Sequence, residues 1–339
     1  MIATLTPKAS FGKEPCSMPL VQKSLIWALD PFEENVTFRA QLMETLRKIS
    51  EKQKLPVQPV YILNLAEESE GEPDIETLSP KQLKQTALKV INKTLETFRN
   101  IHFLRPKVLL EPHTALTTLV KCLTRFSQQS DVSAELIVVG THARVGLPRL
   151  LLGSFTETLL LHSTVPILSV GPGCSLEALG RETQEEAKED RILFATDFTI
   201  YSEKIYGRLL DFASKMHAHL TLFHVIPHSI EPILQTGSYL LSGGWVTAPE
   251  YVTQEDADTQ LLAEKWAQLA SSRGIKTKIC ISSEKHQTAS LIIQQARLEQ
   301  SHWIAMAAES GAAASAILGS ITRQVVRNAP CPVWVVRPT

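Results

Sequence analysis

The fold is decided by two short stretches, ELIVVGTHA at residues 135–143 and LGSFTETLLL at residues 152–161. The first is an apolar run that ends in glycine, which is typical of a strand buried on both faces of a sheet. The second opens with Gly-Ser and continues with helix-forming residues. A buried strand, a glycine loop and the start of a helix indicate a parallel βαβ unit whose helix N-terminus can hold a phosphate.

This unit occurs twice in the chain. Leu-Gly-Ser at 152–154 returns at 318–320, 166 residues later, and an apolar strand follows each copy. Asp30 and Asp197, which each end an apolar run near the start of a copy, are 167 residues apart. Offsets as similar as these predict two domains with the same order of elements.

Strands are expected to alternate with helices throughout each copy. In the first copy the expected strands are 24–30, 57–65, 106–110, 135–140 and 166–170, and the expected helices are 37–54, 80–100, 114–129 and a fourth from 153. This alternation predicts an α/β fold with an open, parallel, five-stranded sheet in each domain and helices on both faces. The expected boundaries are 20–172 for domain 1, 173–189 for a polar linker and 190–339 for domain 2, which contains an insertion at 228–251.

Composition narrows the function classes. At 339 residues the chain is long enough for about two domains, and a net charge of −1 disfavours nucleic acid or a membrane surface as partner. The five cysteines form no Cys-x-x-Cys pair, which predicts reduced thiols and no metal site. The first 23 residues lack the apolar core of a signal peptide, and no apolar run reaches the roughly 18 residues that span a bilayer. We therefore expect a soluble cytoplasmic protein.

Motifs of several enzyme classes are missing from the sequence. It contains no Gly-x-x-x-x-Gly-Lys-Ser/Thr motif of a P-loop ATPase and no Gly-x-Gly-x-x-Gly after the first strand. Spacing assigns no Ser/His/Asp or Cys/His set, so we predict no catalytic residues and no dedicated enzymatic reaction.

A ligand pocket is expected where the parallel strands end, because loops from neighbouring strands converge there. Asp30, Leu65 and Gly140 lie at such ends, and residues 153–156 open a helix whose free N–H groups favour an anion. Simpler interpretations stay open. Each aspartate, Asp30 or Asp197, can cap the turn or helix that follows it, and the helix-start glycines can serve packing alone. The aromatic insertion can be a lid, an interface or a packing element.

The motif Gly140-x-x-Ala143, nine residues, Gly153-Ser154 resembles the Gly-x-x-Gly, nine residues, Gly-Ser/Thr motif of ATP-binding universal stress proteins. Ala143 stands where the second glycine of that motif belongs. The stretch FATDFT at 194–199 looks like the opening strand of the same family. Because the resemblance covers 24–170 and 191–338, the chain resembles a tandem universal stress protein.

This resemblance implies a Rossmann-like fold of the adenine nucleotide alpha hydrolase type, in which the two domains pair through their last strands as a pseudo-dimer. It also implies binding of ATP or AMP, with Mg²⁺ as an optional companion, an unknown protein partner and a role in stress survival. A further homodimer stays open. Two alternatives also stay open: a scaffold protein with vestigial sites that contacts its partner through 228–251, and a slow ATPase switch.

The resemblance assigns roles to residues by position. In domain 1, Asp30 would accept a hydrogen bond from adenine and Leu65 would line the base, while ribose and phosphates would lie against Val139, Gly140, His142, Ala143, Gly153, Ser154, Phe155 and Thr156. The weaker set in domain 2 is Ala195, Thr196, Asp197, Val225, Gly319 and Ser320.

The two loops differ in chemistry. An ungapped alignment of the two loops, at an offset of 166 residues, places Met306 opposite Gly140 and Glu309 opposite Ala143, and a match of the second strands, at an offset of 160, places Val225 opposite Leu65. A carboxylate about 5 Å from a phosphate charge, at an effective dielectric near 20, opposes binding by about 3 kcal/mol. We therefore predict that domain 1 keeps a nucleotide site and that domain 2 has largely lost triphosphate binding, although a shifted loop would restore part of it.

Overall fold

The computed structural model describes residues 22–31, 33, 35–64, 79–98, 100–112, 116–128, 132–141, 154–174, 189–226, 248–284, 286–308 and 318–338. These residues form a first half, 22–174, and a second half, 189–338. Four predicted site residues lie outside the described residues, namely Leu65, His142, Ala143 and Gly153. Glu309 and most of the insertion, residues 228–247, also lie outside them.

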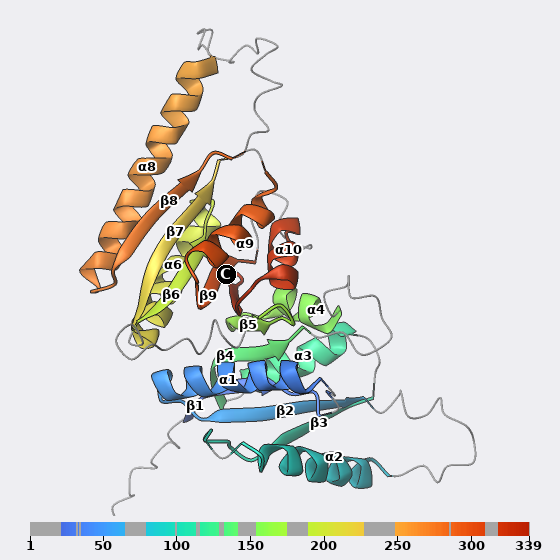
Figure 1. Cartoon of the computed structure of the whole chain (residues 1–339). Coiled ribbons are helices and arrows are strands. Elements are labelled where there is room, and N and C mark those ends of the chain that lie inside the picture. The colour runs from blue at the N-terminus through green and yellow to red at the C-terminus, as the bar shows by residue number, and fades with distance from the viewer. Residues whose placement is uncertain are drawn as a thin grey trace, which may run out of the picture.

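Strands and helices alternate in both halves as predicted (Figure 1). The first half contains β1 (Gln22–Ala28), α1 (Val36–Gln53), β2 (Val57–Asn64), α2 (Pro80–Leu95), β3 (Lys107–Glu111), α3 (Leu116–Ser127), β4 (Val132–Gly140), α4 (Ser154–His162) and β5 (Ile167–Val170). The second contains β6 (Asp190–Ala195), α6 (Ile200–Met216), β7 (Ala218–Val225), α8 (Ala248–Ser272), β8 (Thr277–Ser282), α9 (Thr288–Leu298), β9 (Trp303–Ala307), α10 (Ser320–Asn328) and β10 (Val333–Val336).

The ten strands of the described residues belong to one sheet, in the order β3-β2-β1-β4-β5-β10-β9-β6-β7-β8. Neighbouring strands are parallel within each half, and β5 and β10 meet in antiparallel orientation. The expected pairing through the last strands is therefore confirmed. It follows from sequence, because both strands are short, apolar and buried on both faces, so each needs a partner strand along its open edge.

The two halves are related by an approximate two-fold axis. Val335 pairs with Ile167 and Val333 pairs with Ser169, on either side of the central pair Trp334 and Leu168. If β5 and β10 are exchanged, the pairs stay the same, as expected for a two-fold axis through the central pair. The halves thus contact each other as two subunits of a symmetric dimer would.

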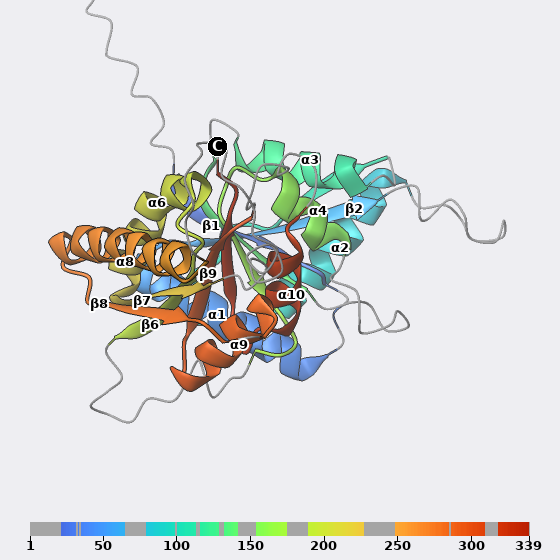
Figure 2. The ribbon, with the colours of Figure 1, turned by 90° about the horizontal axis from the view of Figure 1, so that it is seen from above.

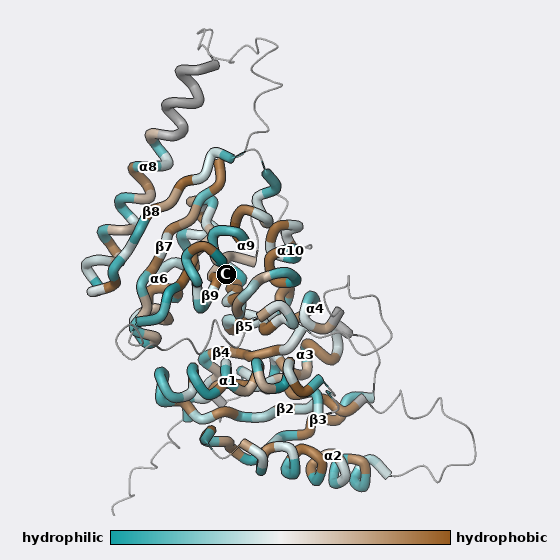
Figure 3. Tube along the Cα trace, in the orientation of Figure 1, coloured by the Kyte–Doolittle hydropathy of each residue, from teal (hydrophilic) through white to brown (hydrophobic). Residues whose placement is uncertain are grey.

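Helices cover both faces of the sheet, which is strongly twisted (Figure 2). Along β1, the side chains of Leu25 and Trp27 enter a core formed with α1, α2, α6 and α8. Ile26, which points to the opposite face, enters a second core with α3, α4, α9 and α10. Figure 3 shows how α2 turns its apolar side to the sheet, and Ala87 and Ile91 are buried there.

Helix α8 extends beyond the sheet at its amino-terminal end (Figure 1). Residues 248–251, the end of the predicted insertion, belong to this helix. None of the helices in the described ranges is long and apolar enough to cross a membrane.

Candidate functional site

Each half has a point where the strand order reverses. In the first half the chain runs from β1 through β2 to β3 on one side and then returns to place β4 on the other side of β1. In the second half β6 and β9 are neighbours in the same way. Loops leaving the carboxyl ends of such neighbours diverge, and the crevice between them is where ligands of open α/β sheets bind.

Asp30 lies at this point in the first half. It follows β1 by two residues, and the end of β1 pairs with the end of β4 through Ala28 and Val139. The residue is exposed. Helix α1 is capped by a different side chain, because the Asn35 carboxamide oxygen accepts the Phe38 N–H at 3.0 Å. Asp30 is therefore not the residue that caps α1.

Asp197 holds the start of the following helix. Its Oδ1 accepts hydrogen bonds from the Thr199 N–H at 3.1 Å, the Thr199 hydroxyl at 2.7 Å and the Ser202 hydroxyl at 2.7 Å. The backbone reaches this arrangement through Phe198, which has a positive φ of 54°. Asp197 thus caps the turn that leads into α6, as the capping interpretation allows.

Gly140 is needed for packing on one side. A Cβ at this position would lie 2.9 Å from Cζ and 3.0 Å from Cε1 of the Phe38 ring, which is closer than real Cβ contacts. On the α1 side of Gly140, the buried Phe38 ring therefore fills the space that the missing side chain leaves. The sequence contains no local signal for this contact between a helix and a strand end.

In each half, the first turn of the last helix forms a hydrogen bond with the end of a neighbouring strand. The buried Thr156 hydroxyl of α4 donates to the Gly140 carbonyl at 3.3 Å. The Thr322 hydroxyl of α10 donates to the Ala307 carbonyl at the same distance. These bonds hold the helix N-termini, including Ser154, Phe155 and Ser320, beside the ends of β4 and β9.

The strand registers correct the predicted alignment of the two loops. Gly140 pairs with the last residue of β5, Val170, and Ala307 pairs with the last residue of β10, Val336. Ala307, and not Met306, is therefore the counterpart of Gly140. The reason is a difference in length, since twelve residues separate Gly140 from Gly153 and eleven separate Ala307 from Gly319. An ungapped comparison hides this deletion.

The register of β7 also differs from the prediction. Val60 pairs with Ala28 in the first half, and Phe223 pairs with Ala195 at the same place in the second. Val225 is consequently the counterpart of Ile62, three residues before Leu65. The first half has more residues between the strand-end aspartate and the helix that follows, and this insertion changes the offset between the halves.

An aromatic group that sequence reasoning did not identify adjoins the crevice of the second half. The His224 Nδ1 lies 2.8 Å from the carbonyl oxygen of Thr196, and the His224 and Phe198 rings have centroids 5.5 Å apart. Phe198 also meets Trp266 of α8 edge-on at 5.1 Å. No group of three or more His, Cys, Asp or Glu side chains that could hold a metal ion occurs among the described residues.

Comparison with known proteins gives the family. The model of the Universal stress protein family matches residues 128–171 and 189–337, more than half of the chain. The chain belongs to the universal stress protein family. The match covers almost all of the second half but only the end of the first, and the strand order of the first half, β3-β2-β1-β4-β5, is the same as the order β8-β7-β6-β9-β10 of the second.

Relatives of this universal stress protein agree with the assignment. A curated universal stress protein from Mycolicibacterium smegmatis is 27% identical over 211 residues, which span 61% of this chain and 63% of that relative. A solved universal stress protein from Archaeoglobus fulgidus has a TM-score of 0.59 at 18% identity and covers 93% of this chain and 98% of its own. A putative one from Pseudomonas aeruginosa has a TM-score of 0.50 at 14% identity, covering 94% of each chain. These structures share the fold with both halves.

Proposed function

We propose that the first half binds an adenine nucleotide, ATP or AMP, in the crevice between β1 and β4. The observation that carries the proposal is the convergence there of Asp30 and the N-terminus of α4. An exposed carboxylate can accept a hydrogen bond from the adenine amino group. The free N–H groups and the dipole of α4 favour the phosphates, and Mg²⁺ would accompany a triphosphate.

Nucleotide complexes are known for two solved universal stress proteins, one from Archaeoglobus fulgidus with dAMP and one with cAMP. Their TM-scores to this chain are 0.30 and 0.29. The proposal therefore rests on the chain's own residues. By their positions, Leu65 would line the base, and Val139, Gly140, His142 and Ala143 would flank the ribose and phosphates, with Gly153 and the first turn of α4 holding the phosphates.

We propose a weaker site in the second half. Three hydrogen bonds from the chain itself already occupy Oδ1 of Asp197 and compete with a base for this oxygen. Ala307 adds a methyl group at the place of Gly140, and the loop that follows is one residue shorter. Any nucleotide there would lie near Ala195, Thr196, Val225, Gly319 and Ser320.

Titration calorimetry with ATP tests which half binds. We expect one dominant site in the wild type, a loss of at least about tenfold in affinity for Asp30→Ala, and a change below about threefold for the matched variant Asp197→Ala. The loss of one charge-assisted hydrogen bond accounts for the tenfold change. Undetectable binding by the wild type would overturn the proposal, and so would loss of binding in Asp197→Ala alone.

We further propose that the protein acts in the stress response by holding nucleotide, without a reaction of its own. Soluble cytoplasmic localisation and an unknown protein partner belong to the same proposal. A hydrolysis assay addresses the alternative of a slow ATPase switch. Turnover that survives purification and disappears in Asp30→Ala would replace the non-catalytic proposal with that alternative.

A further inference from the structure

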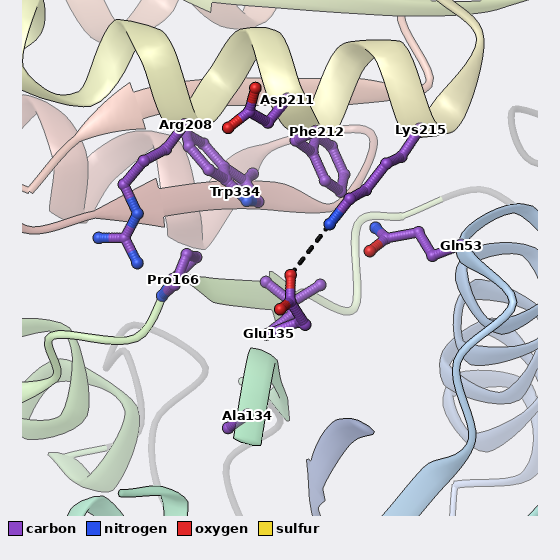
Figure 4. A pocket seen from close by; sticks show the side chains of 10 residues that line it. Gln53, Ala134, Glu135, Pro166, Arg208, Asp211, Phe212, Lys215 and Trp334 are labelled. Atoms are coloured by element: carbon purple, nitrogen blue, oxygen red, sulfur yellow. Dashed lines mark hydrogen bonds and ion pairs between the residues drawn. The ribbon is translucent and has the colours of Figure 1, made fainter. Parts of the chain in front are cut away.

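A cavity of about 180 Å³ lies between the two halves (Figure 4). Its lining comes from α6, from the first half of β4, from Gln53 at the end of α1, from Pro166 next to β5 and from Trp334 of β10. Glu135 and Leu136 are at the opposite end of β4 from Gly140. Five residues of strand separate Glu135 from Gly140, a distance of about 17 Å, so the cavity is separate from the nucleotide crevice.

The two-fold axis gives this cavity a counterpart on the other side. Ile137 and Ile304 occupy equivalent pairs with β5 and β10, so Leu136 is the counterpart of Trp303. Helices α1 and α6 both end in a left-handed residue, Lys54 with φ 54° and His217 with φ 52°. This match makes Arg208 the counterpart of Thr45, 163 residues earlier.

The counterpart of the cavity is filled. The Trp303 ring is fully buried, and its Nε1 donates to Asp190 at 3.2 Å. The Lys48 ammonium lies 5.8 Å from the centroid of that ring. Leu136 is smaller than Trp303, so β4 fills less of the space on the cavity side of the axis than β9 fills on the other side.

The charges around the cavity favour an anion. Its two carboxylates already have partners, since Glu135 pairs with Lys23 at 2.7 Å and Lys215 at 2.9 Å and Asp211 pairs with Arg273 at 2.8 Å. Burial tends to raise the pKa of Glu135, but the hydrogen bonds from the two lysines outweigh it and lower the pKa, so the carboxylate is charged.

The positive charge available to bind an anion is that of Arg208. Its Nη1 donates to the Thr164 carbonyl at 3.2 Å, and no carboxylate of the described residues lies within ion-pair distance of its guanidinium. The side chain is exposed at the mouth of the cavity and extends toward Pro166 (Figure 4). Neighbouring protein desolvates the guanidinium and lowers its pKa, which Glu135 partly offsets, but arginine stays protonated in proteins.

Two aromatic rings form one wall of the cavity. The Phe212 and Trp334 rings are stacked with centroids 5.6 Å apart and planes inclined by 19°. Both line the cavity and are almost fully buried. An engineered cavity of roughly 150 Å³ is known to hold benzene, so a volume of about 180 Å³ is large enough for one aromatic ring.

We propose that this cavity binds a small aromatic carboxylate, with the carboxylate on Arg208 and the ring against Phe212 and Trp334. A guanidinium matches a carboxylate with two parallel hydrogen bonds. The ring would occupy the volume that Trp303 fills across the axis.

Benzoate is a suitable probe, and the full-length protein can be titrated with it by calorimetry or by NMR. For nine non-hydrogen atoms we expect a dissociation constant on the order of 1 mM. Leu136→Trp places an indole in the cavity and should weaken benzoate binding at least about tenfold. Arg208→Gln should do the same for benzoate and leave binding of neutral benzyl alcohol unchanged. Arg125→Gln, which removes an exposed arginine of α3 away from the cavity, is the matched control and should bind as the wild type does.

Three results would overturn the proposal. They are no benzoate binding by the wild type up to about 20 mM, wild-type affinity in folded Leu136→Trp, and inorganic phosphate binding as tightly as benzoate. Circular dichroism verifies folding of each variant. If Leu136→Trp does not fold, the comparison of Arg208→Gln with Arg125→Gln decides.

Discussion

The two sides of the two-fold axis carry different charges on the same backbone. At the start of β6, Asp190 is buried and pairs with Lys48 at 2.7 Å and Lys52 at 3.0 Å on α1. Its counterpart at the start of β1 is Lys23, which pairs with Glu135 on β4. One side is thus a buried carboxylate between two lysines, and the other is a more exposed carboxylate between two lysines, placed on a different strand.

This difference shows what a duplicated chain can do that a homodimer cannot. In a homodimer with two-fold symmetry, a substitution appears on both sides of the axis at once. Here each side is encoded separately, so Trp303 can fill one side while Leu136 leaves the other open. The shared strand registers keep the halves together, and the side chains are free to specialise.

The two charge clusters should differ most in their response to loss of the carboxylate. The Asp190 side chain is 4% exposed and that of Lys48 is 10% exposed, so Asp190→Ala leaves a buried ammonium without its partner. We expect a loss of about 3–5 kcal/mol in the free energy of unfolding. Glu135→Ala should cost about 1 kcal/mol or less, because Lys23 and Lys215 are 63% and 45% exposed. Urea denaturation at pH 7 measures both, and equal losses would contradict the comparison.

The counterpart of Glu135 is His302, and we expect it to make the protein sensitive to mild acid. Burial lowers the pKa of His302 from 6.5 to about 4, with Lys48, Arg191 and Lys52 also lowering it and Asp190 opposing the shift. Because the folded-state pKa is the lower one, folding favours the neutral ring, whose Nδ1 accepts the Arg191 N–H at 3.1 Å. The stabilisation is complete above pH 6.5 and disappears as the pH falls toward 4.

The size of this effect is on the order of 3 kcal/mol. Urea denaturation between pH 7 and pH 4.5 should show most of this loss in the wild type. His302→Asn keeps an acceptor for the Arg191 N–H but has no titrating group, so its stability should change much less over that range. Asp190, whose pKa is lowered from 3.8, loses its contribution only below this window. If the free energy of unfolding fell equally with pH in wild type and variant, a group other than His302 would be responsible for the loss.

The sequence predicts the scaffold well because its determinants are local. Apolar runs such as Leu136 to Val139 identify buried strands without knowledge of their neighbours, and the alternation with helices then leaves few topologies. Pairing of β5 with β10 was predictable for the same reason, since two short apolar strands at the ends of their sheets need a partner.

The candidate site was less predictable because contacts between distant elements decide it. The insertion between Asp30 and Asn35 and the deletion after Ala307 shift the equivalence of the halves, and an ungapped comparison cannot detect either. The contact of Phe38 with Gly140 joins a helix to a strand about a hundred residues away. The cavity at Leu136 becomes apparent only when the two-fold axis relates it to Trp303.

The smallest expected effect concerns Thr156 and Thr322, which make the same bond in the two halves. Thr156→Val and Thr322→Val keep the shape of the side chain and remove a hydrogen bond of 3.3 Å to a strand-end carbonyl. Each should lower the free energy of unfolding by about 1 kcal/mol, because each helix loses one hydrogen bond at its N-terminus. ATP affinity should fall only for Thr156→Val, since we propose that the nucleotide lies against α4. Thermal denaturation with and without ATP separates these outcomes. We expect the two variants to lose the same stability without ATP, and we expect ATP to stabilise Thr156→Val less than it stabilises Thr322→Val. If ATP stabilised both variants equally weakly, the two halves would bind nucleotide alike.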